Sequence, residues 1–159
     1  MNIRVGIGYD VHRLEAGCDL IVGGIKVESE IGAIGHSDAD VLIHAIIDAL
    51  LGAASLRDIG YHFPDTNESY KGIDSKILLE KAMSILTENN WSIVNIDSIV
   101  CLQSPKISEY IPEMLKVLSK ILQIEPERLS IKATTTEKLG FIGKKEGISA
   151  QAVCLIIKS

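Results

Sequence analysis

Hydrophobic residues recur along the chain with two different periods, and the alternation of these periods predicts an α/β fold. Five runs rich in valine and isoleucine are typical of strands: 3–13, 20–27, 93–102, 129–134 and 149–157. Three runs with helical spacing separate them: 38–53, 75–89 and 113–122. We therefore predict a single domain, residues 1–159, of α/β (α+β-like) class with a mixed sheet of four or five strands.

Local signals mark the ends of the helical runs. Ser37 followed by Asp40 resembles a capping box at the start of the first helix, and Gly52 lies near its end. Pro112 directly precedes the third helix. Turn-forming residues fill segment 56–74, which predicts a loop over a functional site.

Two of the predicted strands contain the runs "SIVCL" and "AVCLII", which are apolar at consecutive positions. Such runs indicate a sheet that is covered on both faces. The three predicted helices are enough to cover one face. The other face requires a second copy of the chain, as in a homo-oligomer, or a helix that the pattern does not reveal.

Composition and charge narrow the class of protein. The 159 residues are 47% hydrophobic, which is typical of a globular domain, and 21 acidic against 16 basic residues leave a net charge of -5. No cluster of lysine and arginine provides the positive field that nucleic acids or anionic membranes select. A small-molecule ligand is therefore favoured over either partner.

The cysteines and the N-terminus bear on the compartment. Cys18, Cys101 and Cys154 are an odd number and far apart, so we predict free thiols, mostly in the core, and a reducing environment. No apolar run approaches the ~20 residues that span a bilayer. Met1 leads almost directly into the first strand. We expect a bacterial cytoplasmic protein, or one from a plastid-type organelle if a presequence has been removed.

The stretch "GIGYDVHRL" places ionisable residues in the first predicted strand. Asp10 and His12 are two residues apart, so their side chains point to the same face. The first predicted helix is apolar nearly all round, yet Asp40, His44 and Asp48 form a line along it at four-residue spacing. Burial of such groups is costly unless they are paired or bind a metal. The alternative is that the line is a solvated edge of a half-exposed helix.

Asp10, His12 and His44 together offer one carboxylate and two imidazoles. Three protein ligands with an open fourth position are typical of catalytic zinc sites. The same set suits Fe(II) in oxygenases, which need no phosphate cradle. The D-x-H pattern is weak by itself, so the choice of zinc depends on the segments described next.

The segment "IKATTTEKLGF" indicates a phosphate site. A strand ending at Ala133 opens into Thr134, Thr135 and Thr136, whose hydroxyl and N–H groups can bind phosphate oxygens. Glu137 would repel those phosphates unless a bridging Mg²⁺ lay between them. The alternative is that the threonines only favour a strand and cap a turn.

Two further segments carry candidate binding residues. In "GHSDAD", His36 and Ser37 lie where the chain enters the first helix, and a helix N-terminus favours an anion. Ser37 could equally be no more than the helix cap. In "LQSPKIS", Lys106 supplies a point charge for phosphate, and the proline-shaped loop suits main-chain contacts with a base.

The motifs, taken in order, closely resemble the 2-C-methyl-D-erythritol 2,4-cyclodiphosphate synthase family. "G-x-D-x-H", "HSDAD", "LGAA", "DIG-x-x-FPDT", "PK" and "KATTTEKLGF-x-G" extend from one end of the chain to the other. The resemblance implies a homotrimer with active sites between subunits. It also implies the substrate 4-diphosphocytidyl-2-C-methyl-D-erythritol 2-phosphate, whose own 2-phosphate attacks the β-phosphorus and releases CMP.

The resemblance assigns roles to individual residues. Asp10, His12 and His44 would hold Zn²⁺ or a similar divalent ion, and Glu137 would hold Mg²⁺ or Mn²⁺. His36 and Thr135 would position and stabilise the reacting phosphate. The methylerythritol and its phosphate would contact Ser37, Asp58, Ile59, Gly60, Phe63, Pro64, Asp65, Thr66 and Asn67. The cytidine and α-phosphate would contact Leu102, Gln103, Ser104, Pro105, Lys106, Ile107, Ser108, Thr134 and Thr136. Phe141 and Lys144 complete the predicted substrate-binding set.

The chain departs from the family pattern at a few positions. Lys144 and Lys145 replace the usual Arg-Gly, and lysine lacks the bidentate fork of arginine, which would weaken an isoprenoid diphosphate site on the trimer axis. Asn67 stands where Asp is usual, and "LQSPK" replaces "AQAPK". Two other functions fit the same residues: a metal-dependent phosphohydrolase that uses zinc-bound water, and a non-catalytic nucleotide- or metal-binding module.

Overall fold

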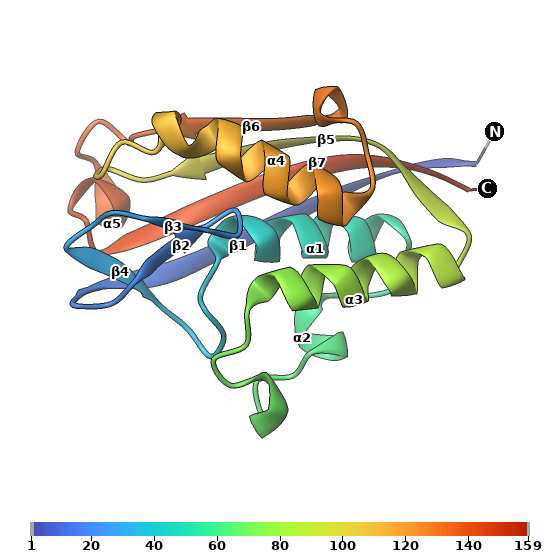
Figure 1. Cartoon of the computed structure of the whole chain (residues 1–159), viewed down its shortest axis with the longest axis horizontal. Coiled ribbons are helices and arrows are strands. Elements are labelled where there is room, and N and C mark those ends of the chain that lie inside the picture. Colours follow the sequence, from blue (N-terminus) through green and yellow to red (C-terminus); the bar gives the residue numbers. More distant parts are fainter. Residues whose placement is uncertain (1, 159) are drawn as a thin grey trace.

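A five-stranded mixed sheet forms the centre of the computed structural model, which describes residues 2–158 (Figure 1). Its strands are β1 (Ile3–Ala16), β4 (Ile31–Ile34), β5 (Trp91–Cys101), β6 (Leu129–Thr134) and β7 (Gly147–Lys158). They lie in the order β4-β1-β7-β5-β6, and only β5 and β6 run parallel. The predicted α+β class with a mixed sheet is confirmed.

Three long helices and several short ones connect the strands. The long helices are α1 (Val41–Ala53), α3 (Ser75–Glu88) and α4 (Ile111–Leu122). The short helices are α2 (Ile59–His62), α5 (Gly140–Gly143) and the 3-10 turns Glu68–Tyr70, Ser108–Tyr110 and Pro126–Arg128. The predicted loop 56–74 therefore contains α2 and a 3-10 turn.

The structure corrects three features that the sequence suggested. The single strand predicted at 20–27 is a hairpin, β2 (Leu20–Val22) and β3 (Ile25–Val27), because Gly23 and Gly24 take φ of 62° and 78° and reverse the chain. Strand β4 was not predicted, since its four residues are too short for a clear alternation. Helix α1 begins after Asp40, which caps it in place of Ser37.

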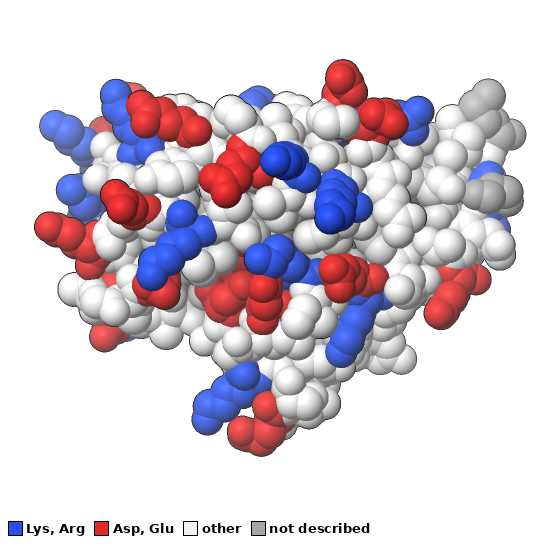
Figure 2. Space-filling model, in the orientation of Figure 1, with Lys and Arg blue, Asp and Glu red and all other residues white. Residues whose placement is uncertain are grey.

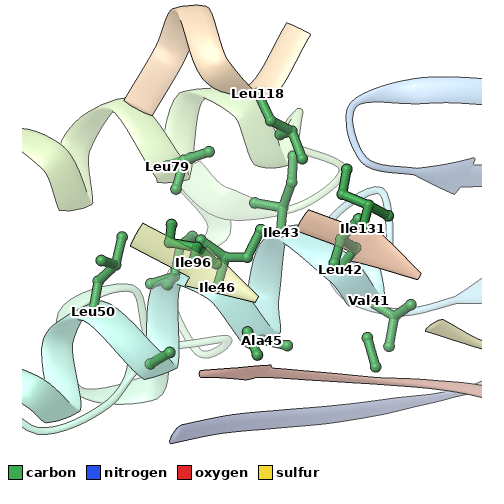
Figure 3. Close-up of a cluster of buried hydrophobic side chains, with 14 of the residues drawn as sticks. Val41, Leu42, Ile43, Ala45, Ile46, Leu50, Leu79, Ile96, Leu118 and Ile131 are labelled. Carbon is green, nitrogen blue, oxygen red and sulfur yellow. The ribbon is translucent and has the colours of Figure 1, made fainter. Parts of the chain in front are cut away.

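Helix α1 is buried between the sheet and the other long helices. Figure 3 shows its Ile43 and Ile46 beside Leu79 of α3, Leu118 of α4 and Ile96 of β5. All five side chains are at most 1% exposed. Only His44, Asp48 and Gly52 of α1 are not fully buried, which explains the nearly continuous apolar sequence and confirms the prediction that the helix is buried.

Strand β1 and helix α1 approach each other unusually closely. A Cβ atom added to Gly8 would lie 1.9 Å from the carbonyl oxygen of Ala45, and one added to Gly6 would lie 2.0 Å from that of Ala49. Glycine on the strand and alanine on the helix therefore allow backbone to pack on backbone. Because Gly6 and Gly8 share a face with Asp10 and His12, the same contact places those two side chains against the helix.

The opposite face of β1 and β7 is apolar and uncovered. Val5, Ile7 and Tyr9 are 67%, 70% and 50% exposed, and Val153 on β7 is 44% exposed. The long helices gather on the other face (Figure 1). No helix among residues 2–158 covers these side chains, so the alternative of an unrecognised covering helix is wrong.

The surface charge and the burial of the cysteines can be compared with the predictions from the sequence. Acidic and basic side chains are intermixed on the face in Figure 2, and none of the described helices has the length and hydropathy to cross a membrane. All three cysteines are free, but only Cys154 is buried. Cys18 and Cys101 are half-buried, so the expectation of mostly core thiols was wrong. Burial raises the pKa of Cys154 to about 11, which keeps that thiol protonated and unreactive.

The contact between β1 and α1 predicts opposite effects for two glycine substitutions. Gly8→Ala forces the strand away from the helix and should lower the free energy of unfolding by about 1–3 kcal/mol. Gly52→Ala is the matched control, because Gly52 is exposed in α1 and an added Cβ meets nothing within 4 Å. It should raise stability by about 0.5–1 kcal/mol. Urea unfolding at one protein concentration measures both, and equal stabilities would contradict the proposed close packing.

Candidate functional site

Three side chains from β1 and α1 converge on a single point. Asp10 Oδ2 lies 2.8 Å from His12 Nε2 and 3.0 Å from His44 Nδ1, and the two nitrogens are 3.2 Å apart. The period of the strand places Asp10 and His12 on one face, and His44 reaches them from the first turn of α1. The three ligand atoms lie within 4.8 Å of one another, so this group could bind a metal ion.

The charges of this group fit a divalent cation. Burial by itself raises the pKa of Asp10, but the hydrogen bonds and charges of His12 and His44 bring it well below its usual range. Burial lowers the pKa of His44, yet the hydrogen bond and charge of Asp10 raise it on balance. Ligand atoms around tetrahedral zinc are about 3.3 Å apart, close to the separations here. The donor set therefore fits such an ion.

The second ring nitrogen of His44 faces two serines. His44 Nε2 lies 2.9 Å from Ser75 Oγ and 3.1 Å from Ser37 Oγ. Ser75 is fully buried at the start of α3 and also contacts the carboxylate of Asp38. The sequence pattern did not reveal Ser75 or Asp38, because their contacts join segments 37 residues apart.

Asp40 and Asp48 do not belong to this group, so the predicted line of Asp40, His44 and Asp48 is not one site. Asp40 is fully buried and accepts hydrogen bonds from the backbone N–H groups of Gly23, Gly24 and Ile43, at 2.9, 2.6 and 3.1 Å. Burial raises its pKa, and these three donors oppose that shift. Asp48 accepts from the N–H of Ile59 at 2.8 Å and holds the start of α2.

A pocket of about 340 Å³ is lined by two of the three candidate ligands, His12 and His44. Eight predicted site residues line it: His12, His36, Ser37, His44, Ile59, Gly60, Phe63 and Asp65. Tyr70, Ile73 and Leu78 also line it and were missed, since apolar residues in a helix or loop carry no distinctive signal. Asp58 caps α2 and Asn67 caps the turn Glu68–Tyr70, so these two residues shape the loop beside the pocket.

A second pocket, of about 200 Å³, lies between the ends of β5 and β6. It brings together Leu102, Gln103, Pro105, Lys106, Ile107 and Ser108 with Ala133, Thr134 and Thr135. These are most of the residues predicted for a cytidine pocket. Thr136 does not line it, and its hydroxyl donates to the carbonyl of Leu139 at 2.7 Å.

Some predicted residues lie outside both pockets. Pro64, Thr66 and Ser104 line neither of them. Phe141 belongs to α5, and Lys144 is the residue that ends it. Glu137 takes φ of 53°, and Thr135 donates to its carboxylate at 3.3 Å.

The two pockets have no residue in common within one chain. Glu137 is not among the ligand atoms grouped with Asp10, His12 and His44, and Thr135 lines only the second pocket. Each pocket therefore holds half of the predicted chemistry. One has the candidate metal ligands and His36, and the other has Lys106 and the threonines.

Comparison with known proteins finds relatives that match nearly the whole chain. The sequence model of the YgbB family matches residues 3–157. A 2-C-methyl-D-erythritol 2,4-cyclodiphosphate synthase from Phocaeicola vulgatus is 56% identical over 159 residues, which cover 100% of this chain and 99% of that protein. The CDP complex of IspF from Plasmodium falciparum is 36% identical with a TM-score of 0.88, covering 99% of this chain and 97% of that one. Bifunctional IspDF from Campylobacter jejuni is 39% identical with a TM-score of 0.95 over 99% of this chain, which spans only 42% of that longer protein.

The different roles of Asp40 and His44 predict different losses on substitution. His44→Ala should abolish bound metal while the fold survives, since α1 is held mainly by its apolar side chains, such as Ile43 and Ile46, which are fully buried. Asp40→Ala leaves three backbone N–H groups without their acceptor and should cost about 2 kcal/mol or more of stability. Elemental analysis and urea unfolding measure the two effects. A full metal complement in the His44 variant would contradict the assignment of this residue as a ligand.

Proposed function

The chain belongs to the YgbB family, and from this membership we propose that its two pockets form one active site between neighbouring subunits of a homotrimer. Its activity is that of a 2-C-methyl-D-erythritol 2,4-cyclodiphosphate synthase, a cyclising phosphorus-oxygen lyase of isoprenoid biosynthesis. The observation that carries the proposed site is the convergence of Asp10, His12 and His44 beside a pocket lined by His36 and Gly60.

The reaction is an intramolecular phosphoryl transfer on 4-diphosphocytidyl-2-C-methyl-D-erythritol 2-phosphate. An oxygen of the 2-phosphate forms a bond to the β-phosphorus, and the bond from that phosphorus to the bridging oxygen breaks. The bridging oxygen leaves with its electron pair as part of CMP, and the organic product is the cyclic 2,4-diphosphate. No water enters and no proton must be removed from the nucleophile, because the attacking phosphate is already ionised.

We assign Zn²⁺ to Asp10, His12 and His44, and Mg²⁺ or Mn²⁺ to Glu137. A bound divalent cation polarises phosphoryl oxygens and neutralises charge that develops on them. The need is electrostatic, because a chain of net charge -5 would otherwise repel a substrate with several phosphate oxygens. Lys106, in the second pocket, provides a fixed positive charge for the same substrate.

The residues around the two pockets position the reacting groups. His36 and Ser37 lie beside the candidate ligands, where they can hold the 2-phosphate, and the loop with Gly60 and Phe63 encloses the methylerythritol. Thr135, with Thr134 and Lys106, lies in the second pocket and orients the α- and β-phosphates. Positioning of this kind supplies most of the catalysis in phosphoryl transfer.

The second pocket is assigned to the cytidine group. Its loop from Leu102 to Ser108 is half-buried, offers main-chain groups, and adjoins the threonines that would meet the α-phosphate. A related protein of known structure is a CDP complex, which supports a small cytidine nucleotide as the ligand.

A location in the bacterial cytoplasm and a role of Phe141 and Lys144 in substrate binding stay predictions.

The homotrimer accounts for two features of the single chain. Val5, Ile7 and Tyr9 lie on an uncovered apolar face of the sheet, which burial against other copies would remove from water. Each pocket by itself contains only part of the predicted active site. A neighbouring subunit would bring Glu137 and Thr135 of one chain to the metal ligands of the next.

The source of oxygen in the product distinguishes cyclisation from hydrolysis of the same substrate. Turnover in ¹⁸O-labelled water should give an organic product without label, lighter than the hydrolysis product by one water, because the new bond uses the 2-phosphate oxygen. Mass spectrometry of the product and of CMP measures this. Label in the organic product at the rate of CMP release would establish a phosphohydrolase instead.

Mixed assemblies test the shared site. His44→Ala and Glu137→Gln subunits, each inactive alone, should regain activity when unfolded and reassembled together. If each site takes its metal ligands from one subunit and Glu137 from the next, an equal mixture restores about one quarter of the sites. The matched control mixes His44→Ala with a double variant, His44→Ala/Glu137→Gln, and should stay inactive. Absence of recovery in the first mixture, with trimers present by light scattering, would place each site within one chain.

A further inference from the structure

We propose that Gln103 is a positioning residue that holds Glu137 in place for a divalent cation. Its side chain lies in the loop after β5 and fixes the peptide that joins Glu137 to Lys138 in the loop after β6. Glu137 is taken as a ligand of Mg²⁺ or Mn²⁺ from the proposed function, on which this role of Gln103 depends. Gln103 then serves the site through the backbone of a second loop, and not through a side-chain contact with the cytidine.

The contact of Gln103 joins the loop of the second pocket to the turn that carries Glu137. The N–H of Lys138 donates to Gln103 Oε1 at 3.1 Å, across 35 positions of sequence. Beside this contact, the N–H of Leu102 donates to the carbonyl of Thr134 at 3.0 Å, where the parallel pairing of β5 and β6 ends. A backbone N–H can only donate, so it is the amide oxygen of Gln103 that faces it. The two loops are therefore held together by backbone and by one side chain.

The turn that Gln103 contacts has a costly backbone conformation. Glu137 and Lys138 take φ of 53° and 65°, so two consecutive residues with a Cβ atom lie in the left-handed region. Such residues persist there only where surrounding contacts fix them. Rotation of the peptide between these two residues would change the direction of the Glu137 side chain. The contacts of this peptide therefore control where the carboxylate lies.

Different contacts hold the two sides of Lys138. Its carbonyl side lies against α5, since a Cβ atom added to Gly143 would be 2.1 Å from the carbonyl carbon of Lys138. Its N–H side belongs to the peptide from Glu137, and Gln103 is the acceptor there. Loss of this acceptor would let the peptide rotate and would let Lys138 return to the negative φ that such residues prefer.

The side chain of Glu137 has weak contacts of its own. The Thr135 hydroxyl donates to Glu137 Oε1 at 3.3 Å and accepts from the Glu137 N–H at 3.3 Å. Both distances are longer than in a typical hydrogen bond, so they direct the carboxylate only loosely. Carboxylate oxygens are ligands that Mg²⁺ selects. A loosely directed carboxylate depends on its backbone for its position, and this is what Gln103 supplies.

Gln103→Met tests this role because it keeps the length of the side chain and removes the acceptor. The Lys138 N–H should exchange with solvent about 3- to 10-fold faster in ¹⁵N NMR, the factor expected for the loss of one hydrogen bond. The Mg²⁺ concentration that gives half-maximal activity should rise by a similar factor. Affinity for CMP without added Mg²⁺, measured by calorimetry, should be unchanged.

Lys138→Gly provides the decisive comparison, because glycine takes a positive φ at no steric cost. In the double variant Gln103→Met/Lys138→Gly, the Mg²⁺ requirement should return most of the way to that of Lys138→Gly alone. Glycine in another loop could not replace a side chain that contacted the nucleotide directly. Gln103→Glu keeps an acceptor and should retain slow exchange of the Lys138 N–H.

Gln123→Ala is the matched control. Gln123 is an exposed glutamine at the end of α4 and lines neither of the two pockets. Its removal should change neither the exchange of the Lys138 N–H nor the Mg²⁺ requirement.

An unchanged exchange rate or an unchanged Mg²⁺ requirement in Gln103→Met would overturn the proposal. So would a loss of CMP affinity that Lys138→Gly does not restore, since Gln103 would then bind the nucleotide itself. An unchanged Mg²⁺ response in Glu137→Gln would instead reject the assignment of the second cation. Exchange of the Lys138 N–H would still show whether Gln103 fixes this peptide.

Discussion

The close contact between β1 and α1 is the constraint on which the rest of the structure depends. Without side chains at Gly6 and Gly8, the strand lies directly against the carbonyl groups of Ala45 and Ala49. This distance brings His44 within hydrogen-bond range of Asp10 and His12. It also buries α1 so deeply that α3 and α4 must cover its outer side (Figure 3). Core packing and candidate metal site are therefore set by the same few small residues.

The short segment before α1 divides its polar residues between the site and the scaffold. His36 and Ser37 line the pocket, and Asp38 binds Ser75, which contacts His44. Asp40 faces the opposite way and fastens the hairpin of β2 and β3 through Gly23 and Gly24. Among the described residues, no buried side-chain nitrogen or oxygen lacks a hydrogen-bond partner. Such complete pairing lets this chain bury charge close to its core without a large loss of stability.

Two features of the single chain would be explained by an oligomer: the division of the binding groups between two pockets, and the uncovered apolar face of the sheet. Each chain presents its metal ligands in one pocket and its threonines and Lys106 in another. An oligomer in which the apolar face carrying Val5 and Ile7 is buried would supply the missing half from a neighbour. Under the proposed function, assembly and activity would then be coupled, since a separated subunit could bind parts of the substrate without closing the ring.

The sequence by itself determined the features that depend on short-range periodicity. A strand repeats every two residues, so Asp10 and His12 had to share a face, and the apolar pattern of 41–53 had to give a buried helix. The same pattern grouped Asp40 with His44, and only tertiary structure showed that Asp40 turns to the glycines of a hairpin. The contacts of His44 with Ser75 and Asp10 join residues more than 30 positions apart. Spacing along a helix limits where a side chain can point, but its partner is chosen by which distant segment packs there.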